Sequence, residues 1–120
     1  NLKQKFIKAD NEEITRLFTN IISNAVKYNI ENGLINIYMN NTDKYLIVAV
    51  EDSGIGMKPE EKDKLFREFF RAKNEFTKEI SGTGLGLSIV KRIVESYSGK
   101  IEVESEFGEG SIFTIHLPIN

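Results

Sequence analysis

The stretch Val48-Ala49-Val50-Glu51-Asp52-Ser53-Gly54-Ile55-Gly56-Met57 decides the fold, because an apolar strand ends there at a carboxylate and two alternating glycines. A strand as apolar as Tyr45–Glu51 is expected near the centre of a sheet. Asp52 then lies at the mouth of the sheet, and glycine permits a ligand to approach the backbone closely. A carboxylate accepts hydrogen bonds and cannot donate them, so Asp52 favours adenine, with its exocyclic amine, over guanine, which has a carbonyl there. An Asx turn between a strand and a helix explains the stretch equally well.

The elements around this stretch follow the order β-α-β-β-α-loop-α-β-β, with apolar residues at spacings of three and four in the helices. This order predicts an α/β (α+β) two-layer sandwich, with a mixed sheet and helices packed on one face. The expected strands are Lys3–Ala9, Leu34–Asn40, Tyr45–Glu51, Lys100–Glu106 and Ser111–Pro118. The first expected helix begins near Asn11, the second spans Pro59–Ala72 and the third spans Leu87–Ser98. A loop is expected over Lys73–Gly86.

Composition limits the possible functions. The 120 residues predict a single domain over 1–120, and 16 Lys and Arg against 18 Asp and Glu argue against a nucleic-acid partner. The sequence has no run of 18 apolar residues, so we expect no segment of it to span a membrane. We also expect no membrane contact by this domain, a monomer in isolation and a cytoplasmic location, which a membrane-anchored parent protein would also allow. Cysteine is absent and His116 is the single histidine, which argues against thiolate and histidine-rich metal sites. Asn1 in place of an initiator methionine suggests a domain excised from a longer chain.

A polar stripe follows the first helix. At about 100° per residue, Asn20, Asn24 and Lys27 lie within roughly 40° of one another, away from the centre of the apolar stripe. Two amides and an ammonium group suit an oxygen-ligated cation beside a phosphate, since Mg²⁺ needs few protein ligands. A solvated helix face is the alternative.

The third motif is Gly82-Thr83-Gly84-Leu85-Gly86-Leu87, which opens the last helix. Alternating glycines before a helix N-terminus make an anion site of backbone N–H groups. The motif lacks the Gly-Lys-Ser/Thr of a P-loop and the spacing of a dinucleotide fingerprint.

Taken together, these motifs resemble the catalytic ATP-binding domain of two-component sensor histidine kinases, the Bergerat fold shared with gyrase-type ATPases. The resemblance runs from about Phe6 to Pro118 and includes the final hairpin after Gly108. The matching boxes are the N-box N-I-I-S-N-A-V-K-Y (Asn20–Tyr28), the G1 box D-S-G-I-G-M (Asp52–Met57), the F-box L-F-R-E-F-F-R (Leu65–Arg71), a lid at Lys73–Ser81 and the G2 box at Gly82–Leu87.

The resemblance implies Mg²⁺ and ATP as cofactors, with Asn24 ligating the metal and Asn20 supporting the phosphate side. It implies that Lys27 and Arg71 contact phosphates and that Tyr28 lines the pocket. It further implies that the adenine amine donates to Asp52. The remaining binding residues are glycines and their neighbours in the two boxes: Gly54, Ile55, Gly56, Gly82, Thr83, Gly84, Leu85, Gly86 and Leu87. For the aromatic residues Phe66, Phe69 and Phe70, core packing is the more ordinary role.

Transfer is favoured over hydrolysis, because Asn20 stands where related ATPases place a glutamate base and an amide cannot take up a proton. Glu13 lies on the same stripe, about 10 Å earlier along the helix. His116 is expected to be structural or solvent-facing, because it lies in the closing strand with no acidic neighbour. The family's acceptor histidine belongs to a separate dimerisation domain, of the same or the partner chain, which then serves a response-regulator receiver domain. The alternatives are a regulatory module of the same fold, such as an anti-sigma-type serine kinase or an ATP sensor, and an interaction domain with a degenerate pocket.

Overall fold

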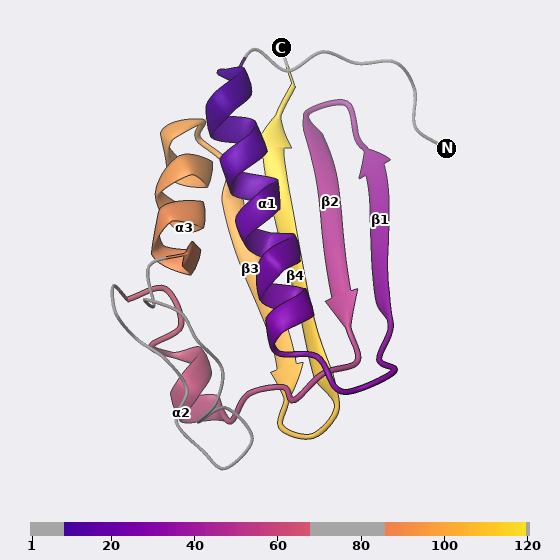
Figure 1. Cartoon of the computed structure of the whole chain (residues 1–120). Coiled ribbons are helices and arrows are strands. Elements are labelled where there is room, and N and C mark those ends of the chain that lie inside the picture. The colour runs from indigo at the N-terminus through magenta and orange to yellow at the C-terminus, as the bar shows by residue number, and fades with distance from the viewer. Residues whose placement is uncertain (1–8, 68–85, 120) are drawn as a thin grey trace.

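The computed structural model describes residues 9–67 and 86–119, which form one sheet with helices on one of its faces (Figure 1). The described strands are ordered β1-β2-β4-β3, and all three ladders are antiparallel. Their bounds are β1 Ile35–Asn41, β2 Tyr45–Asp52, β3 Lys100–Glu106 and β4 Gly110–Pro118. The prediction of a two-layer sandwich, with β2 inside the sheet, is therefore confirmed.

The prediction of a mixed sheet is not met by the described strands. β2 and β3 run in the same direction, but β4 lies between them and is antiparallel to both. The two parallel strands therefore never pair, and every described neighbour is antiparallel. The strand predicted at Lys3–Ala9 lies outside the described residues except for Ala9, which is not in a strand.

The long helices form where the apolar spacing predicts them. Helix α1 spans Asn11–Lys27, and the carboxylate of Asp10 caps it by accepting the backbone N–H groups of Glu12 at 2.8 Å and Glu13 at 3.2 Å. These bonds satisfy donors that have no partner within the first turn of a helix. Helix α3 spans Gly86–Ser96, one residue earlier than predicted at its start and two shorter at its end.

The second predicted helix is wrong in length. Helix α2 covers only Pro59–Lys62. After it, the backbone bonds shorten to i→i−3, as in the N–H of Leu65 to the carbonyl of Lys62 at 3.3 Å. These tighter turns bring Leu65 into the core at 8% exposure. The remainder of the predicted helix, 68–72, and the predicted lid lie outside the described residues.

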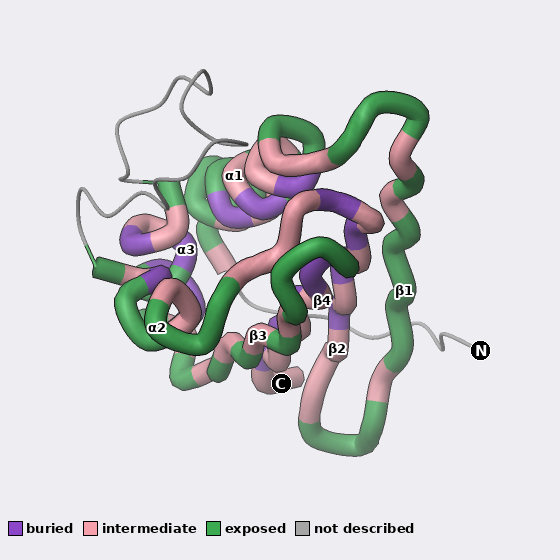
Figure 2. The backbone as a smooth tube through the Cα atoms, turned by 90° about the horizontal axis from the view of Figure 1, so that it is seen from below, coloured by how far each residue is buried: buried purple, intermediate pink, exposed green. Residues whose placement is uncertain are grey.

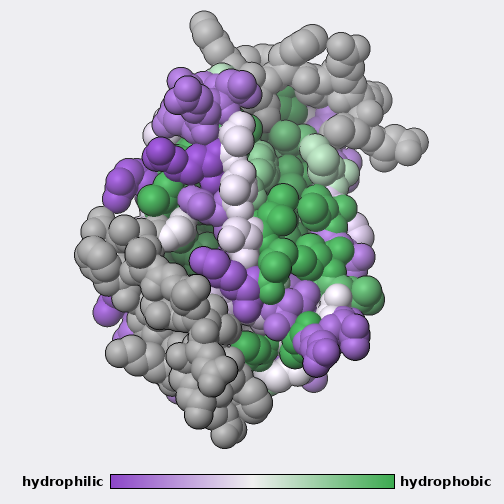
Figure 3. Space-filling model, viewed as in Figure 1, coloured by the Kyte–Doolittle hydropathy of each residue, from purple (hydrophilic) through white to green (hydrophobic). Residues whose placement is uncertain are grey.

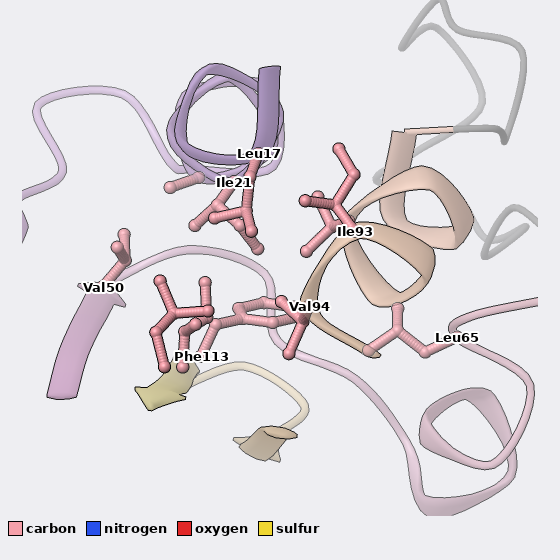
Figure 4. Packing of buried hydrophobic residues seen from close by; sticks show 11 residues of the cluster. Leu17, Ile21, Val50, Leu65, Ile93, Val94 and Phe113 are labelled. Atoms are coloured by element: carbon pink, nitrogen blue, oxygen red, sulfur yellow. The ribbon is translucent and has the colours of Figure 1, made fainter. Parts of the chain in front are cut away.

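The hydrophobic core lies between the helices and the sheet (Figure 4). Leu17 and Ile21 of α1 point toward Val94 of α3 and toward Val50 and Phe113 of the sheet (Figure 4). The remaining buried members of this cluster are Ala25, Leu65, Val90, Ile93, Ile115 and Leu117. Each large side chain buried there contributes about 1.5–3 kcal/mol to stability.

The helix layer covers the sheet unevenly. Strand β1 is exposed along most of its length (Figure 2). A hydrophobic surface lies over β1 and β2 beside α1 (Figure 3), with Ile37 50% exposed, Met39 52% exposed and Val26 of α1 60% exposed. Within the described residues, no helix combines the length and apolar character needed to span a membrane.

Candidate nucleotide site

The carboxylate of Asp52 is buried at the end of β2, with the residue 5% exposed. Its Oδ1 accepts the backbone N–H of Gly54 at 2.9 Å, and the backbone of Ser111 also donates to this carboxylate. Burial raises the pKa of Asp52, with a smaller contribution from the charge of Glu51, while the two backbone bonds oppose the rise. The fold thus holds an acceptor in fixed orientation at a desolvated position.

Asp52 begins the G1 loop, Asp52–Met57. The end of α1 fixes one side of this loop. The N–H of Ile55 donates to the carbonyl oxygen of Tyr28 at 2.9 Å. A side chain at Gly54 would collide with that same carbonyl oxygen. The predicted N-box and G1 box therefore meet in space, and the backbone of Tyr28 makes the contact.

The turn between β3 and β4 fixes the other side of the G1 loop. The N–H of Gly108 donates to the carbonyl oxygen of Ile55 at 2.6 Å. Gly56 has φ +72°, and a side chain there would collide with the carbonyl oxygen of Glu106. Only glycine adopts such a conformation at little cost. The sequence motifs did not predict this contact, because it depends on how β3 and β4 are paired with β2.

The polar stripe predicted on α1 is present in the helix. Asn20 and Asn24 are half-buried, and Lys27 is exposed in the last turn. The C-terminal half of α1, the end of β2 and the start of α3 lie toward the same end of the molecule (Figure 1). Asn24 and Lys27 lie in the last turns of α1, and Asp52 is the last residue of β2.

The described part of the G2 box begins α3. Gly86 is exposed at the first position of the helix, and Leu87 packs against the hydrophobic core. Phe66 of the F-box also packs against the core, and the Lys91 ammonium lies 5.4 Å from its ring centroid. The other predicted residues of these boxes lie outside the described ranges: Phe69, Phe70, Arg71, Gly82, Thr83, Gly84 and Leu85.

Two further titratable residues have partners away from the Asp52 carboxylate. The Glu13 carboxylate accepts the Tyr97 hydroxyl at 2.8 Å. The imidazole of His116 lies on the sheet face opposite the helices, with Nδ1 3.8 Å from Oε1 of Glu102 on the neighbouring strand. The expectation that His116 has no acidic neighbour is therefore wrong, because strand pairing brings a residue distant in sequence beside it.

Comparison with known proteins identifies the family. The model of the histidine kinase-, DNA gyrase B- and HSP90-like ATPases matches residues 9–120. The chain belongs to this family. Sensor histidine kinase RppB of Synechocystis is 37% identical over 107 residues, which are 89% of this chain and 24% of that protein. Sensor histidine kinase WalK of Bacillus subtilis is 37% identical over 115 residues, which are 94% of this chain and 19% of that protein.

Solved structures agree with the family assignment. The mycobacterial sensor histidine kinase MprB superposes with a TM-score of 0.84 at 27% identity, covering 95% of this chain and 77% of that one. The catalytic domain of histidine kinase ThkA superposes with a TM-score of 0.78 at 34% identity, covering 93% of this chain and 71% of that one. The chain thus has the Bergerat fold of histidine kinase catalytic domains. It spans about a quarter of the length of RppB and about a fifth of the length of WalK.

Proposed function

We propose that this domain binds Mg-ATP and donates the γ-phosphate to a histidine on a separate dimerisation and phosphoacceptor domain, as the catalytic part of a two-component sensor kinase. The observation that carries the proposal is the buried Asp52 carboxylate, which backbone donors hold in place at the end of β2. Two of its acceptor positions are used by Gly54 and Ser111. An ionised carboxylate has about four such positions, so it retains capacity for the adenine amine.

The residues present fit the Mg²⁺ that this family implies. Within residues 9–67 and 86–119, no three His, Cys, Asp or Glu side chains cluster as a metal cage. Mg²⁺ keeps several waters and needs only one or two protein oxygens beside substrate phosphates, and the half-buried amide of Asn24 can supply one. When bound, the ion would neutralise charge on the phosphates. Asn20 and Lys27 would hold the phosphate groups, with Arg71 and the G2 glycines as further proposed contacts.

Transfer to another protein is better supported than hydrolysis. The Asn20 amide cannot accept a proton at neutral pH, and Glu13 is bonded to Tyr97 at the start of α1. Glu13 also lies about 10 Å of helix rise before Asn20, so neither side chain is placed as a base for water beside Asn24. The ATP-binding domain would present the γ-phosphate and leave activation of the acceptor to its partner.

His116 is an unsuitable acceptor within the same chain. Asp52 is paired with Ser111, five residues before His116 on β4, which corresponds to about 17 Å along the strand. The two side chains also lie on opposite faces of the sheet. The proposal therefore places the acceptor histidine on another domain, with a response-regulator receiver domain downstream and a cytoplasmic location for the complex.

The test is a calorimetric titration of the domain with a non-hydrolysable ATP analogue and with its GTP counterpart, with and without Mg²⁺. Replacing Asp52 by Asn exchanges a charged acceptor for an amide. We expect the Asp52→Asn variant to bind the ATP analogue about 10- to 150-fold more weakly, as for the loss of a hydrogen bond to a charged group. Equal affinity of variant and parent, or absence of binding by both, would exclude the proposed nucleotide site.

A further inference from the structure

A row of polar side chains crosses three strands beside the G1 loop. Ser105 of β3 is paired with Ser111 of β4, and Ser111 is paired with Asp52 of β2. The hydroxyl oxygens of the two serines are 2.8 Å apart. Ser111 and Asp52 are buried and Ser105 is half-buried, on the sheet face that the helices cover. The row therefore ends at the carboxylate that the proposed function assigns to adenine.

The hydroxyl of Ser105 joins the far end of the G1 loop to the start of β4. It accepts the backbone N–H of Met57 at 2.8 Å and lies 2.9 Å from the carbonyl oxygen of Gly110, to which it can donate. The next residue, Ser111, donates its backbone N–H to Asp52. The Ser105 hydroxyl thus connects Met57, the last residue of the G1 loop, to the start of β4, which orients the Asp52 carboxylate at the beginning of the loop.

The other hydrogen bonds of the G1 loop hold its middle, so the position of Met57 at its exit depends on Ser105. Ile55, in the middle of the loop, is held by Tyr28 and Gly108. At the loop exit, Gly56 packs against the backbone of Glu106, and the bond from the Met57 N–H to Ser105 is the one hydrogen bond in the described structure that ties Met57 to the sheet. Without the hydroxyl, the half-buried N–H of Met57 would lose its partner, and the loop exit would be held less firmly unless water replaced the hydroxyl.

We propose that Ser105 is a positioning residue for nucleotide binding: its hydroxyl holds the exit of the G1 loop against β4 and thereby fixes the Asp52 carboxylate toward the base. The inference rests on the proposed function, since it assigns adenine recognition to Asp52. It adds a residue from the opposite edge strand, about 50 positions later in the sequence. Ser105 itself need not touch the nucleotide.

The test compares Ser105→Thr with Ser105→Val, two side chains of nearly equal shape that differ in the hydroxyl. The ligands are the ATP analogue, its GTP counterpart and inorganic tripolyphosphate, which has no base. We expect Ser105→Thr to bind the ATP analogue within about twofold of the parent, and Ser105→Val to bind it about 3- to 10-fold more weakly. Tripolyphosphate affinity should be equal in the two variants, and the preference for ATP over GTP should fall in Ser105→Val alone.

Two further measurements separate positioning from general stability. Thermal unfolding of both variants, and of Ser105→Ala as a smaller substitution expected to match Ser105→Val, establishes the folded fraction used in each titration. In the Asp52→Asn background, the change from Thr to Val at 105 should no longer alter ATP affinity, because the carboxylate that it positions is gone.

Equal ATP affinity of Ser105→Val and Ser105→Thr would overturn the inference. So would an equal loss of ATP and tripolyphosphate affinity, or full additivity with Asp52→Asn. Failure of the proposed function is recognised separately, because Asp52→Asn alone would then bind ATP as tightly as the parent.

Discussion

At the scale of single residues, the buried carboxylate of Asp52 lowers the stability of the folded chain when it is ionised and is the proposed acceptor for the adenine amine. Its pKa is raised chiefly by burial, so the ionised form is disfavoured in the folded chain relative to the unfolded chain. A group with a raised folded pKa contributes stability below its unfolded pKa and loses that contribution as pH rises through the folded value. At any pH above this raised pKa, the free domain carries an ionised carboxylate that a bound adenine amine can satisfy.

This predicts opposite effects of Asp52→Asn on stability and on binding. The amide oxygen can still accept from Gly54, and the charge is removed, so the free domain should be at least as stable as the parent at pH 7. The advantage should shrink as pH falls through the raised pKa, because the parent carboxyl then gains its proton in the folded chain. Urea unfolding on either side of that pKa measures this, and a large loss of stability at pH 7 would contradict it.

The pH dependence of binding follows from the same group. Protonation of Asp52 removes the charge that favours the adenine amine, so affinity for the ATP analogue should fall as pH drops through the raised pKa. Asp52→Asn has no such group, and its weaker affinity should change less over the same range of pH. Parallel pH profiles for parent and variant would assign the titration to another group.

At the scale of elements, the sequence predicted what depends on local periodicity and missed what depends on pairing. Helix α1 begins at Asn11 as predicted, and strands β2 and β3 lie within one residue of their predicted bounds. The predicted helix from Pro59 failed because Leu65 turns into the core, a tertiary effect that apolar spacing does not encode. Ser105 was missed for a similar reason, since its contact with Met57 exists only once the sheet is assembled.

The G1 loop and the turn between β3 and β4 each contain one glycine with positive φ, and the two give a matched pair of substitutions. Gly56→Ala places a methyl group against the Glu106 carbonyl at φ +72°, whereas Gly108→Ala has φ +89° and no described atom within 4 Å. Both variants bear the backbone cost of a positive φ, about 1–3 kcal/mol. Gly56→Ala should lose more unfolding free energy than Gly108→Ala, and should also weaken ATP binding. Equal losses in urea unfolding would show that the loop is not packed against this turn.

A substitution at Gly86, the first residue of α3, distinguishes a role of this glycine in stability from a role in nucleotide binding. No described atom lies within 4 Å of a methyl group added at Gly86, and its φ is not positive. Alanine there should leave stability unchanged or raise it by up to about 1 kcal/mol, as within a helix. If the backbone of the G2 box approaches phosphate, Gly86→Ala should nevertheless weaken binding of the ATP analogue. Unchanged affinity by calorimetry would remove Gly86 from the proposed site.

At the scale of the whole molecule, the sheet separates two chemistries. The helix-covered face holds Asp52 and the serine row, and the opposite face holds His116 beside Glu102. The sequence motifs predicted the family and the two-layer fold. The sheet face on which each of these side chains lies follows from the strand register. Together they support the proposal of a domain that binds the phosphate donor and serves an acceptor on another domain.

The most direct test of that account is incubation with γ-labelled ATP and Mg²⁺ of the domain alone, of the domain with the phosphoacceptor domain of its parent kinase, and of the same mixture with the acceptor histidine replaced. We predict acid-labile label on the acceptor domain in the second mixture only, and the same result for a His116→Gln variant. Stoichiometric label on the domain alone that disappears with His116→Gln, or release of the label to water without transfer, would contradict the account.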